Sequence, residues 1–282
     1  MFEGTKARLQ VFTPDMQTPS SRPVTSRIDE DAVEFDDVSF LDINGDPYFV
    51  VAARFDLTGT TVHYETLQGG VFANVDDETG FNGYKLTMTA FAEDDQLSLR
   101  GASLVGGTNS LDLPDANVET RGNAIWINVD GLFFSTGDGF NLRLNLKFDG
   151  DGGRDVFLGG DGKDLVLGRG GADVLAGGNG RDSINGGKGS DLIDGGAGRD
   201  MLTGGGGGDT FVFFVFGDYR GRDTITDFDV ARDRLLVAGE AERFRDLDIS
   251  NTKAGALVTA GAGKVLLEDV RAGELEADMF LF

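Results

Sequence analysis

The chain has 282 residues, 40 % of them hydrophobic, so it is long enough for two domains with real cores and is not expected to be disordered. Its 48 Asp and Glu residues outnumber its 25 Lys and Arg residues, and the formal net charge of −23 argues against nucleic acid as a partner. Because the chain has no cysteine, disulfides and thiolate metal sites are excluded, and bound ions become the obvious means of stabilisation.

The N-terminal segment, Met1 to Phe12, has no basic stretch followed by an apolar run, and no part of the chain approaches the length of a membrane span. We therefore expect neither a cleaved signal peptide nor a transmembrane segment. A secreted protein of this sequence would need an export signal elsewhere in the chain.

Residues 28 to 148 alternate apolar and polar residues in short runs, such as Tyr48 to Phe55, Tyr84 to Phe91 and Phe140 to Phe148. Gly, Asn and Asp clusters separate these runs, and no window shows a helical period. The pattern predicts an antiparallel β-sandwich over residues 1–148. Pro14 to Arg27 contains three of the five prolines and is expected to be irregular.

Residues 150 to 212 consist of seven consecutive nine-residue units without insertions or deletions. The sixth position of every unit is Asp, and the eighth is a large apolar residue. A flexible glycine-rich linker would need neither feature. The Asp residues are Asp155, Asp164, Asp173, Asp182, Asp191, Asp200 and Asp209.

Each unit joins a glycine-rich turn to a three-residue strand, so two units should make one coil of a parallel β-roll. Stacked coils lie about 4.8 Å apart, which places the Asp residues of alternate units in two columns. Neighbouring carboxylates in a column repel by about 3 kcal/mol at an effective dielectric constant near 20, and a divalent cation between coils would reverse this repulsion. The three intervals in one column and two in the other predict about five ions.

Oxygen ligands that are numerous and flexible favour Ca²⁺ over Mg²⁺, and the lack of imidazole or sulfur ligands disfavours zinc and copper. The predicted ligands are the seven Asp carboxylates and backbone carbonyl oxygens of turn glycines. These glycines are Gly153, Gly160, Gly162, Gly171, Gly178, Gly180, Gly187, Gly189, Gly196 and Gly198. Arg169 replaces the second glycine of its unit, and we expect the site beside it to be the weakest.

The units resemble the GGxGxDxUx repeats of RTX proteins, which bind calcium. This resemblance implies export of the unfolded chain from a Gram-negative bacterium through a type I ABC exporter, with folding on extracellular calcium. It also implies an uncleaved C-terminal secretion signal, and the last residues, Glu276 to Phe282, are similar to one. Residues 213–282 continue in β-type runs and are predicted to cap the roll. The segment from Gly208 to Val237 resembles the capping strands of serralysin-type proteins, and this resemblance makes Asp223, Asp227 or Asp229 the candidate to complete a terminal calcium site.

No motif for catalysis is evident. The only histidine, His63, is not part of an HExxH sequence, and no GxSxG sequence occurs. Acidic runs such as Asp76 to Glu78 and Asp94-Asp95 are expected in the loops of so acidic a chain, and we predict no catalytic residue among them and no cofactor besides calcium.

The sequence therefore predicts an all-β protein in three parts. These are an N-terminal antiparallel β-sandwich (1–148), a right-handed parallel β-roll (149–212) and a β cap with the secretion signal (213–282). We favour a secreted, non-catalytic matrix, adhesion or biofilm protein, with extracellular polysaccharide or a cell surface as its partner. The alternative is a calcium-stabilised extracellular enzyme that acts on a surface polysaccharide.

Overall fold

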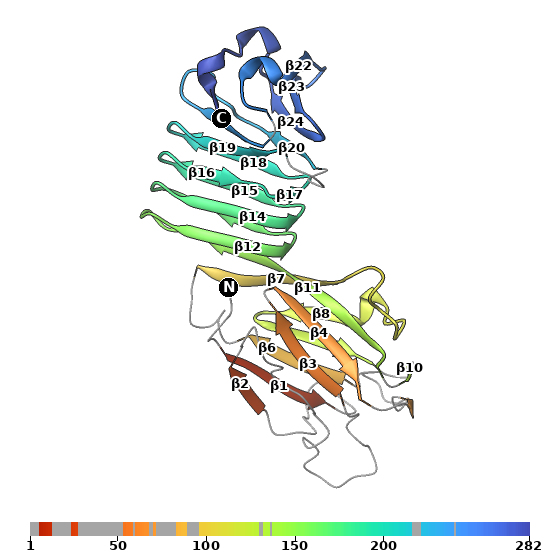
Figure 1. Ribbon diagram of the computed structural model, residues 1–282. Helices are drawn as coiled ribbons and strands as arrows, with labels where there is room; N and C mark the ends of the chain where they lie inside the picture. The colour runs from red at the N-terminus through yellow and green to blue at the C-terminus, as the bar shows by residue number, and fades with distance from the viewer. Residues whose placement is uncertain are drawn as a thin grey trace. The chain divides into compact units, whose positions relative to one another are not determined.

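The computed structural model describes residues 6–12, 24–27, 53–58, 60–67, 70–71, 83–88, 96–129, 132–135, 137–215, 221–239 and 241–282. The chain divides into two compact units, Met1–Asn145 and Leu146–Phe282. Apart from four short 3-10 helices, the regular elements formed by these described residues are β-strands, which confirms the predicted all-β class (Figure 1). No helix among the described residues is long and apolar enough to cross a membrane.

The first unit contains two antiparallel sheets. One has the strand order β2-β1-β6-β9-β8, formed by β2 (Val24–Arg27), β1 (Lys6–Phe12), β6 (Gly83–Met88), β9 (Ala124–Asn128) and β8 (Val118–Arg121). The other pairs β3 (Ala53–Thr58) with β4 (Thr61–Thr66) and β4 with the start of β11 (Gly139–Asp149), which also pairs with β7 (Leu97–Leu104). The other described elements of this unit are a two-stranded ribbon, β5 (Gly70–Val71) with β10 (Phe133–Phe134), and the 3-10 helix η2 (Asp115–Asn117).

Aromatic side chains join these two sheets. Tyr84 on β6 lies 5.1 Å from the Phe55 ring and 5.5 Å from the Tyr64 ring, measured between ring centroids, and Tyr64 stacks on Phe140 at 4.8 Å. All four residues are buried. They form the core between the faces of two sheets, so the predicted sandwich is confirmed.

The expectation of an irregular segment from Pro14 to Arg27 is wrong for its last four residues. Val24–Arg27 form β2, which pairs antiparallel with β1, with Leu9 opposite Val24. These residues follow Pro23, and the β-branched Val24 and Thr25 suit a strand at the edge of the sheet. Residues 14–23 lie outside the described part of the chain.

The second unit is built on two parallel walls, seen as stacked coils in Figure 1. Its first wall contains β12 (Val156–Gly162), β14 (Val174–Gly180), β16 (Leu192–Asp194) and β19 (Thr210–Phe214), with the short β17 (Ala197–Gly198) paired to β14. The second contains the end of β11, then β13 (Leu165–Leu167), β15 (Ser183–Lys188) and β18 (Met201–Gly206). Each residue pairs with the residue eighteen positions later, as Val174 does with Leu192 and Ile184 with Leu202. The predicted coil of two repeats is therefore confirmed.

The eighth position of each repeat fills the space between the walls. Phe157, Val166, Leu175, Ile184, Ile193, Leu202 and Phe211 are all at most 4 % exposed. Phe157 stacks on Phe148 of β11 at 4.8 Å, and Phe211 contacts Phe228 beyond the last repeat. One apolar column thus continues past both ends of the array.

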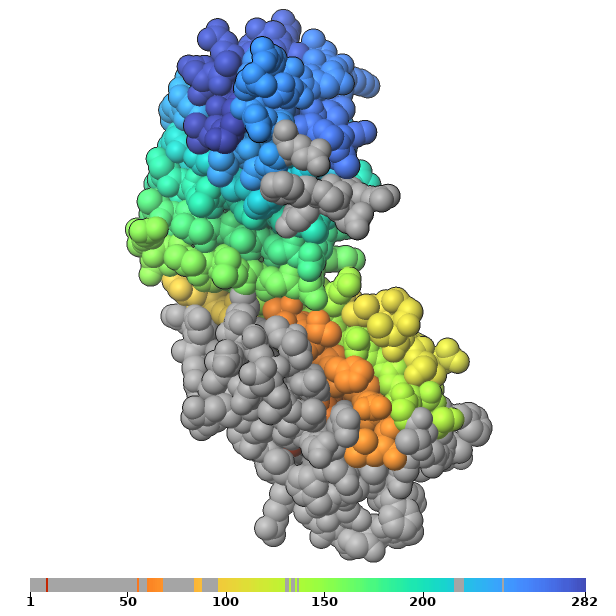
Figure 2. Space-filling model, viewed as in Figure 1, coloured from red at the N-terminus to blue at the C-terminus, as the bar shows by residue number. Residues whose placement is uncertain are grey.

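Residues after the array extend both walls. β21 (Arg234–Ala238) and β25 (Phe280–Leu281) lengthen the first wall, while β20 (Arg222–Ile225) and β24 (Gly263–Glu268) lengthen the second. The second wall then closes with two antiparallel strands, β23 (Gly255–Ala260) and β22 (Asp248–Asn251). Three 3-10 helices, η3 (Phe244–Asp246), η4 (Ala272–Glu274) and η5 (Ala277–Met279), connect these strands. Array and cap form one continuous surface in Figure 2.

Truncation of an inward-facing residue should destabilise the roll much more than truncation of its outward-facing neighbour. Ile193 is fully buried and its neighbour Leu192 is 38 % exposed on the same short strand. We expect Ile193→Ala to lower the free energy of unfolding by about 2–5 kcal/mol and Leu192→Ala by less than about 1 kcal/mol. Calcium-saturated chemical denaturation measures both, and equal losses would contradict the inward direction of the eighth position.

Candidate calcium sites

The structure places the Asp residues of alternate repeats in two columns, as predicted. Within each column, Oδ1 of one Asp accepts a hydrogen bond from the backbone N–H of the Asp one coil earlier. The distance is 2.8 Å from Asp155 N to Asp173, and 2.9 Å from Asp173 N to Asp191. The column that begins with Asp164 repeats this contact at 2.8 and 2.9 Å. Each carboxylate therefore joins two coils through its first oxygen.

The second carboxylate oxygen is a different case. In Asp173, Asp182, Asp191, Asp200 and Asp209 the Oδ2 atom is buried and accepts no hydrogen bond from the described part of the protein. These five side chains are at most 3 % exposed. A buried polar atom without a partner is costly, and for an ionised carboxylate the cost is larger still. These five oxygens therefore need a cation or a proton, and the Oδ2 atom of Asp164 is buried in the same columns.

Asp155, at the start of the array, differs. Its Oδ2 accepts a hydrogen bond of 3.0 Å from the backbone N–H of Asp151, the residue that replaces the second glycine of its unit. The first predicted ligand is therefore satisfied by the chain itself.

Glycine at the first position of each repeat lies beside Oδ2. A Cβ atom on Gly168 would stand 2.5 Å from both Asp173 Oδ2 and the carbonyl oxygen of Gly186, one coil later. Gly177 and Gly186 have the same surroundings, with the carbonyls of Gly195 and Gly204. The unpartnered carboxylate oxygens and the carbonyls of the following coil therefore converge where no side chain fits. Sequence reasoning missed these carbonyls, although glycine at the first position of every unit was the signal.

The glycines predicted as ligands occupy the second and fourth positions, where successive turns stack directly on one another. A Cβ on Gly171 would collide with the carbonyl of Gly153, and one on Gly189 with that of Gly171. At the second position the carbonyl of Arg169 accepts a 2.9 Å hydrogen bond from Lys188 N in the next coil. These glycines are thus placed in the turns as expected, and their role as ligands stays a prediction.

Arg169 keeps the turn conformation of the glycine that it replaces. Its φ is 68°, in the left-handed region that Gly160 and Gly178 also occupy at this position. The side chain points away from the Asp column and forms an ion pair with Asp149. The guanidinium of Arg169, together with the Lys147 ammonium, lowers the pKa of the Asp149 carboxyl.

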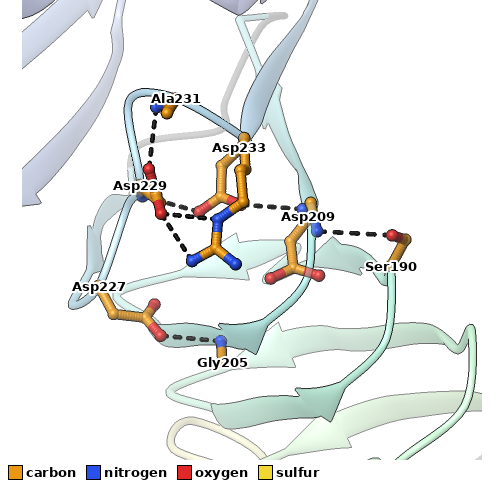
Figure 3. Close-up of polar contacts among 9 residues, drawn as sticks. Ser190, Gly205, Asp209, Asp227, Asp229, Ala231 and Asp233 are labelled. Atoms are coloured by element: carbon orange, nitrogen blue, oxygen red, sulfur yellow. Dashed lines mark hydrogen bonds and ion pairs between the residues drawn. The ribbon is translucent and has the colours of Figure 1, made fainter.

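The cap continues both Asp columns. Asp200 N donates to Asp223 Oδ1 at 3.1 Å. Asp209 N donates to Asp233 Oδ1 at 2.9 Å (Figure 3). The steps are 23 and 24 residues instead of eighteen. Sequence reasoning named Asp223 but missed Asp233, although each precedes by two residues an apolar residue that is buried, Ile225 and Leu235.

Asp227 and Asp229, also considered for a terminal site, are bound to other donors (Figure 3). Asp227 accepts hydrogen bonds from Gly204 N and Gly205 N, both at 2.8 Å. Asp229 accepts from Ala231 N at 2.9 Å and pairs with Arg232. These two carboxylates brace the turn that follows the array.

The described part of the chain contains no group of three or more His, Cys, Asp or Glu side chains suited to one metal ion. Each candidate site instead combines an Asp carboxylate with backbone oxygens, a hard donor set suited to calcium. A family model for the RTX calcium-binding nonapeptide repeat matches residues 149–184 and 176–211. The chain is an RTX calcium-binding repeat protein. Its repeats bind calcium, and the unpartnered Asp oxygens fit that ion.

Solved structures similar to this RTX protein include two of known origin. The AlgE6R2 subunit from the Azotobacter vinelandii mannuronan C5-epimerase is 32 % identical, over 46 % of this chain and 92 % of that subunit, with a TM-score of 0.35. The extracellular lipase LipA from Serratia marcescens is 22 % identical, over 65 % of this chain and 31 % of the lipase, with a TM-score of 0.26. No curated protein matches the chain. The family match alone carries the identification.

Of the other residues considered from the sequence, the structure describes His63. His63 is exposed on β4, and its ring nitrogen Nδ1 contacts the Asn141 side chain on β11. The acidic runs Asp76 to Glu78 and Asp94-Asp95 lie outside the described residues.

The pKa values of the Asp carboxyls in the two columns are raised, because burial disfavours their ionised form. Burial raises the pKa of Asp182 and Asp209 to about 6, and burial with the nearby Asp223 carboxylate raises that of Asp200 to about 8. Burial also raises the pKa of Asp173 and Asp191. A cation beside each carboxylate would reverse this shift, because it stabilises the ionised form.

These shifts predict the pH dependence of the metal-stripped protein. Because the folded-state pKa values lie above the ordinary Asp value, protonation favours the fold, and stability falls as pH rises through about 6 to 8. We expect the melting temperature in calcium-free buffer to decrease from pH 5 to pH 8. With saturating calcium the trend should reverse, because the ion binds the carboxylate form. A flat calcium-free profile would contradict the burial of ionisable oxygens.

An isosteric substitution separates the two oxygens of one carboxylate. Asn in Asp191→Asn can still accept the hydrogen bond from Asp173 N, but it places an uncharged amide where Oδ2 lies. We expect this variant to be at least as stable as the parent without calcium, and about 1–3 kcal/mol less stable in excess calcium. Asp248→Asn, at an exposed position of β22, is the control and should change neither value. Equal loss with and without calcium would refute the metal role of Asp191.

Proposed function

We propose that this RTX protein is a secreted, non-catalytic matrix, adhesion or biofilm protein whose roll completes its fold on meeting calcium outside the cell. One observation carries the proposal. Five buried Asp oxygens lie in two columns without a donor, so the core of the roll is complete only where a divalent cation is available. Modules that work at extracellular calcium levels bind the ion with a Kd of roughly 10⁻⁴ to 10⁻³ M.

The residues that would hold the ions are Asp173, Asp182, Asp191, Asp200 and Asp209. Each would be joined by glycine carbonyls of its own turn and of the next coil, such as Gly195 for Asp182 and Gly204 for Asp191. With Asp164, whose Oδ2 lies beside Gly159 and the Gly177 carbonyl in the same way, six carboxylates fit this role, one more than the five ions expected from the sequence. The bound ion supplies positive charge and a fixed link between coils, and no chemical step is assigned to it.

The segment that resembles a type I secretion signal, Glu276 to Phe282, is only partly covered in the fold. Met279 of η5 and Phe280 of β25 are buried, whereas Leu281 and Phe282 are 42 % and 47 % exposed. We infer that a type I ABC exporter of a Gram-negative bacterium secretes the calcium-free chain, which then folds on calcium outside the cell, as the resemblance to RTX proteins implies.

Calcium titration of the metal-stripped, full-length protein tests this function. We expect a cooperative gain of β-structure near 10⁻⁴ to 10⁻³ M Ca²⁺, little response to Mg²⁺, and about five ions counted by native mass spectrometry. The same preparation should be retained on polysaccharide-coated Gram-negative cells in calcium and released by a chelator. A protein folded equally well without divalent ions would overturn the proposal, and turnover of a surface polysaccharide would replace it with an enzymatic role.

A further inference from the structure

One edge of the roll carries a basic residue in every coil. The fifth position of the second, fourth and sixth repeats holds Lys163, Arg181 and Arg199, and Arg222 takes the same place in the cap. Their neighbours are in register on both sides: Gly162 pairs with Gly180 and Gly180 with Gly198, while Asp164, Asp182, Asp200 and Asp223 form one ladder. The four exposed cations, called here the basic row, are therefore stacked one per coil at about 4.8 Å.

The turn itself does not require these charges. On the opposite edge the fifth position is Arg154, Ala172, Ser190 and Gly208 in successive coils, with the same backbone ladder beneath. Small neutral residues are thus accommodated at this position. Like charges stacked in adjacent coils repel one another, so stability alone does not favour four cations in line. The row is also a local exception on a chain of net charge −23.

The described residues on both sides of the basic row are glycines or non-aromatic residues. On one side lie the fourth-position glycines Gly162, Gly180, Gly198 and Gly221, which present no side chain. On the other side lie Leu165, Ser183, Met201 and Thr224, and Met201 is 55 % exposed. Aromatic rings that stack on bases, with which proteins hold single-stranded nucleic acid, are thus lacking among these described residues. Arg181, Arg199 and Arg222 form no ion pair within the part of the chain that the structure describes.

We propose that the basic row binds a linear acidic polysaccharide, which lies along the roll axis and places its carboxylates against successive coils. This inference rests on the proposed extracellular binding function and names its partner and surface. A straight array of cations on a flat strip matches a polymer with regularly spaced anions better than a compact ligand. Guanidinium groups bind carboxylates through paired hydrogen bonds, and three of the four cations are Arg.

Calcium occupancy controls the charge of this edge. Each cation of the basic row is followed directly by an Asp of the column, so four carboxylates offset four cations when no metal is bound. Calcium at the predicted ligands among them, Asp164, Asp182 and Asp200, leaves the basic row in excess. Binding of an acidic polymer therefore depends on calcium both through the fold and through the charge of the edge.

The test compares full-length, calcium-loaded variants for binding of a defined oligogalacturonate too short to gel with calcium. The first variant combines Arg181→Ser, Arg199→Ser and Arg222→Ser, which copies the Ser190 of the other edge. The matched control removes three exposed cations elsewhere, through Arg154→Ser, Lys188→Ser and Lys253→Ser. We expect the first variant to lose affinity about tenfold or more and the control less than about twofold, with binding weakened by added salt. Equal calcium content and circular dichroism spectra establish that all three proteins are folded.

Equal losses in the two variants would reduce the effect to net charge and overturn the inference. So would failure of the calcium-loaded parent to bind oligogalacturonate more tightly than a neutral oligosaccharide. In that case calcium-dependent retention on cells would still uphold the proposed function, whereas calcium-independent folding would remove it. Tighter binding to anionic lipid vesicles or single-stranded DNA, lost in the first variant alone, would assign the row to another polyanion and refute the polysaccharide.

Discussion

The roll depends on the contact between buried carboxylates and successive coils. One oxygen of each Asp closes the hydrogen-bond ladder to the coil before it, and this contact holds the other oxygen inside the turn, where water does not reach. No side chain of the described roll donates a hydrogen bond to the second oxygen of Asp173, Asp182, Asp191, Asp200 or Asp209. Calcium is therefore part of the core of this fold, as a disulfide is in many small secreted domains, and the chain contains no cysteine to take its place.

The column of Asp carboxylates is coupled to the column of buried apolar side chains, because each apolar residue follows an Asp by two positions in the sequence. Asp191 enters the turn and Ile193 enters the core from the same short stretch, and the same spacing joins Asp200 to Leu202. A coil whose carboxylate is not neutralised cannot seat its apolar residue without also burying charge. Each coil contacts only its neighbours, so neutralisation of one interval favours the next, and folding of the whole stack is expected to be cooperative.

The strict nine-residue periodicity of the array made the roll predictable. Beyond the array this periodicity is lost, and the positions of the corresponding Asp residues could no longer all be predicted. Seven uninterrupted repeats were enough to derive the eighteen-residue coil, both Asp columns and the buried eighth position. The cap keeps the spacing from Asp to apolar residue at Asp223 and Asp233, but its longer steps of 23 and 24 residues hid the second of them. The carbonyls at the first position were not predicted as ligands, because the direction of a backbone carbonyl depends on the backbone angles and not on the side chain that the sequence specifies. Strand β2 was missed because it is stabilised by pairing with β1, and this pairing cannot be inferred from the local content of prolines.

The division of labour within a repeat explains where binding can reside. The first position must accommodate Oδ2, the second and fourth must allow close stacking of turns, the sixth holds the carboxylate and the eighth fills the core. Arg169 shows how narrow this requirement is, because it adopts a left-handed backbone and sends its side chain outward to Asp149. Positions three, five, seven and nine are left to face solvent. Two edges with one backbone can thus differ in chemistry, and on the edge of the basic row the fifth position is Lys or Arg in every coil from Lys163 to Arg222.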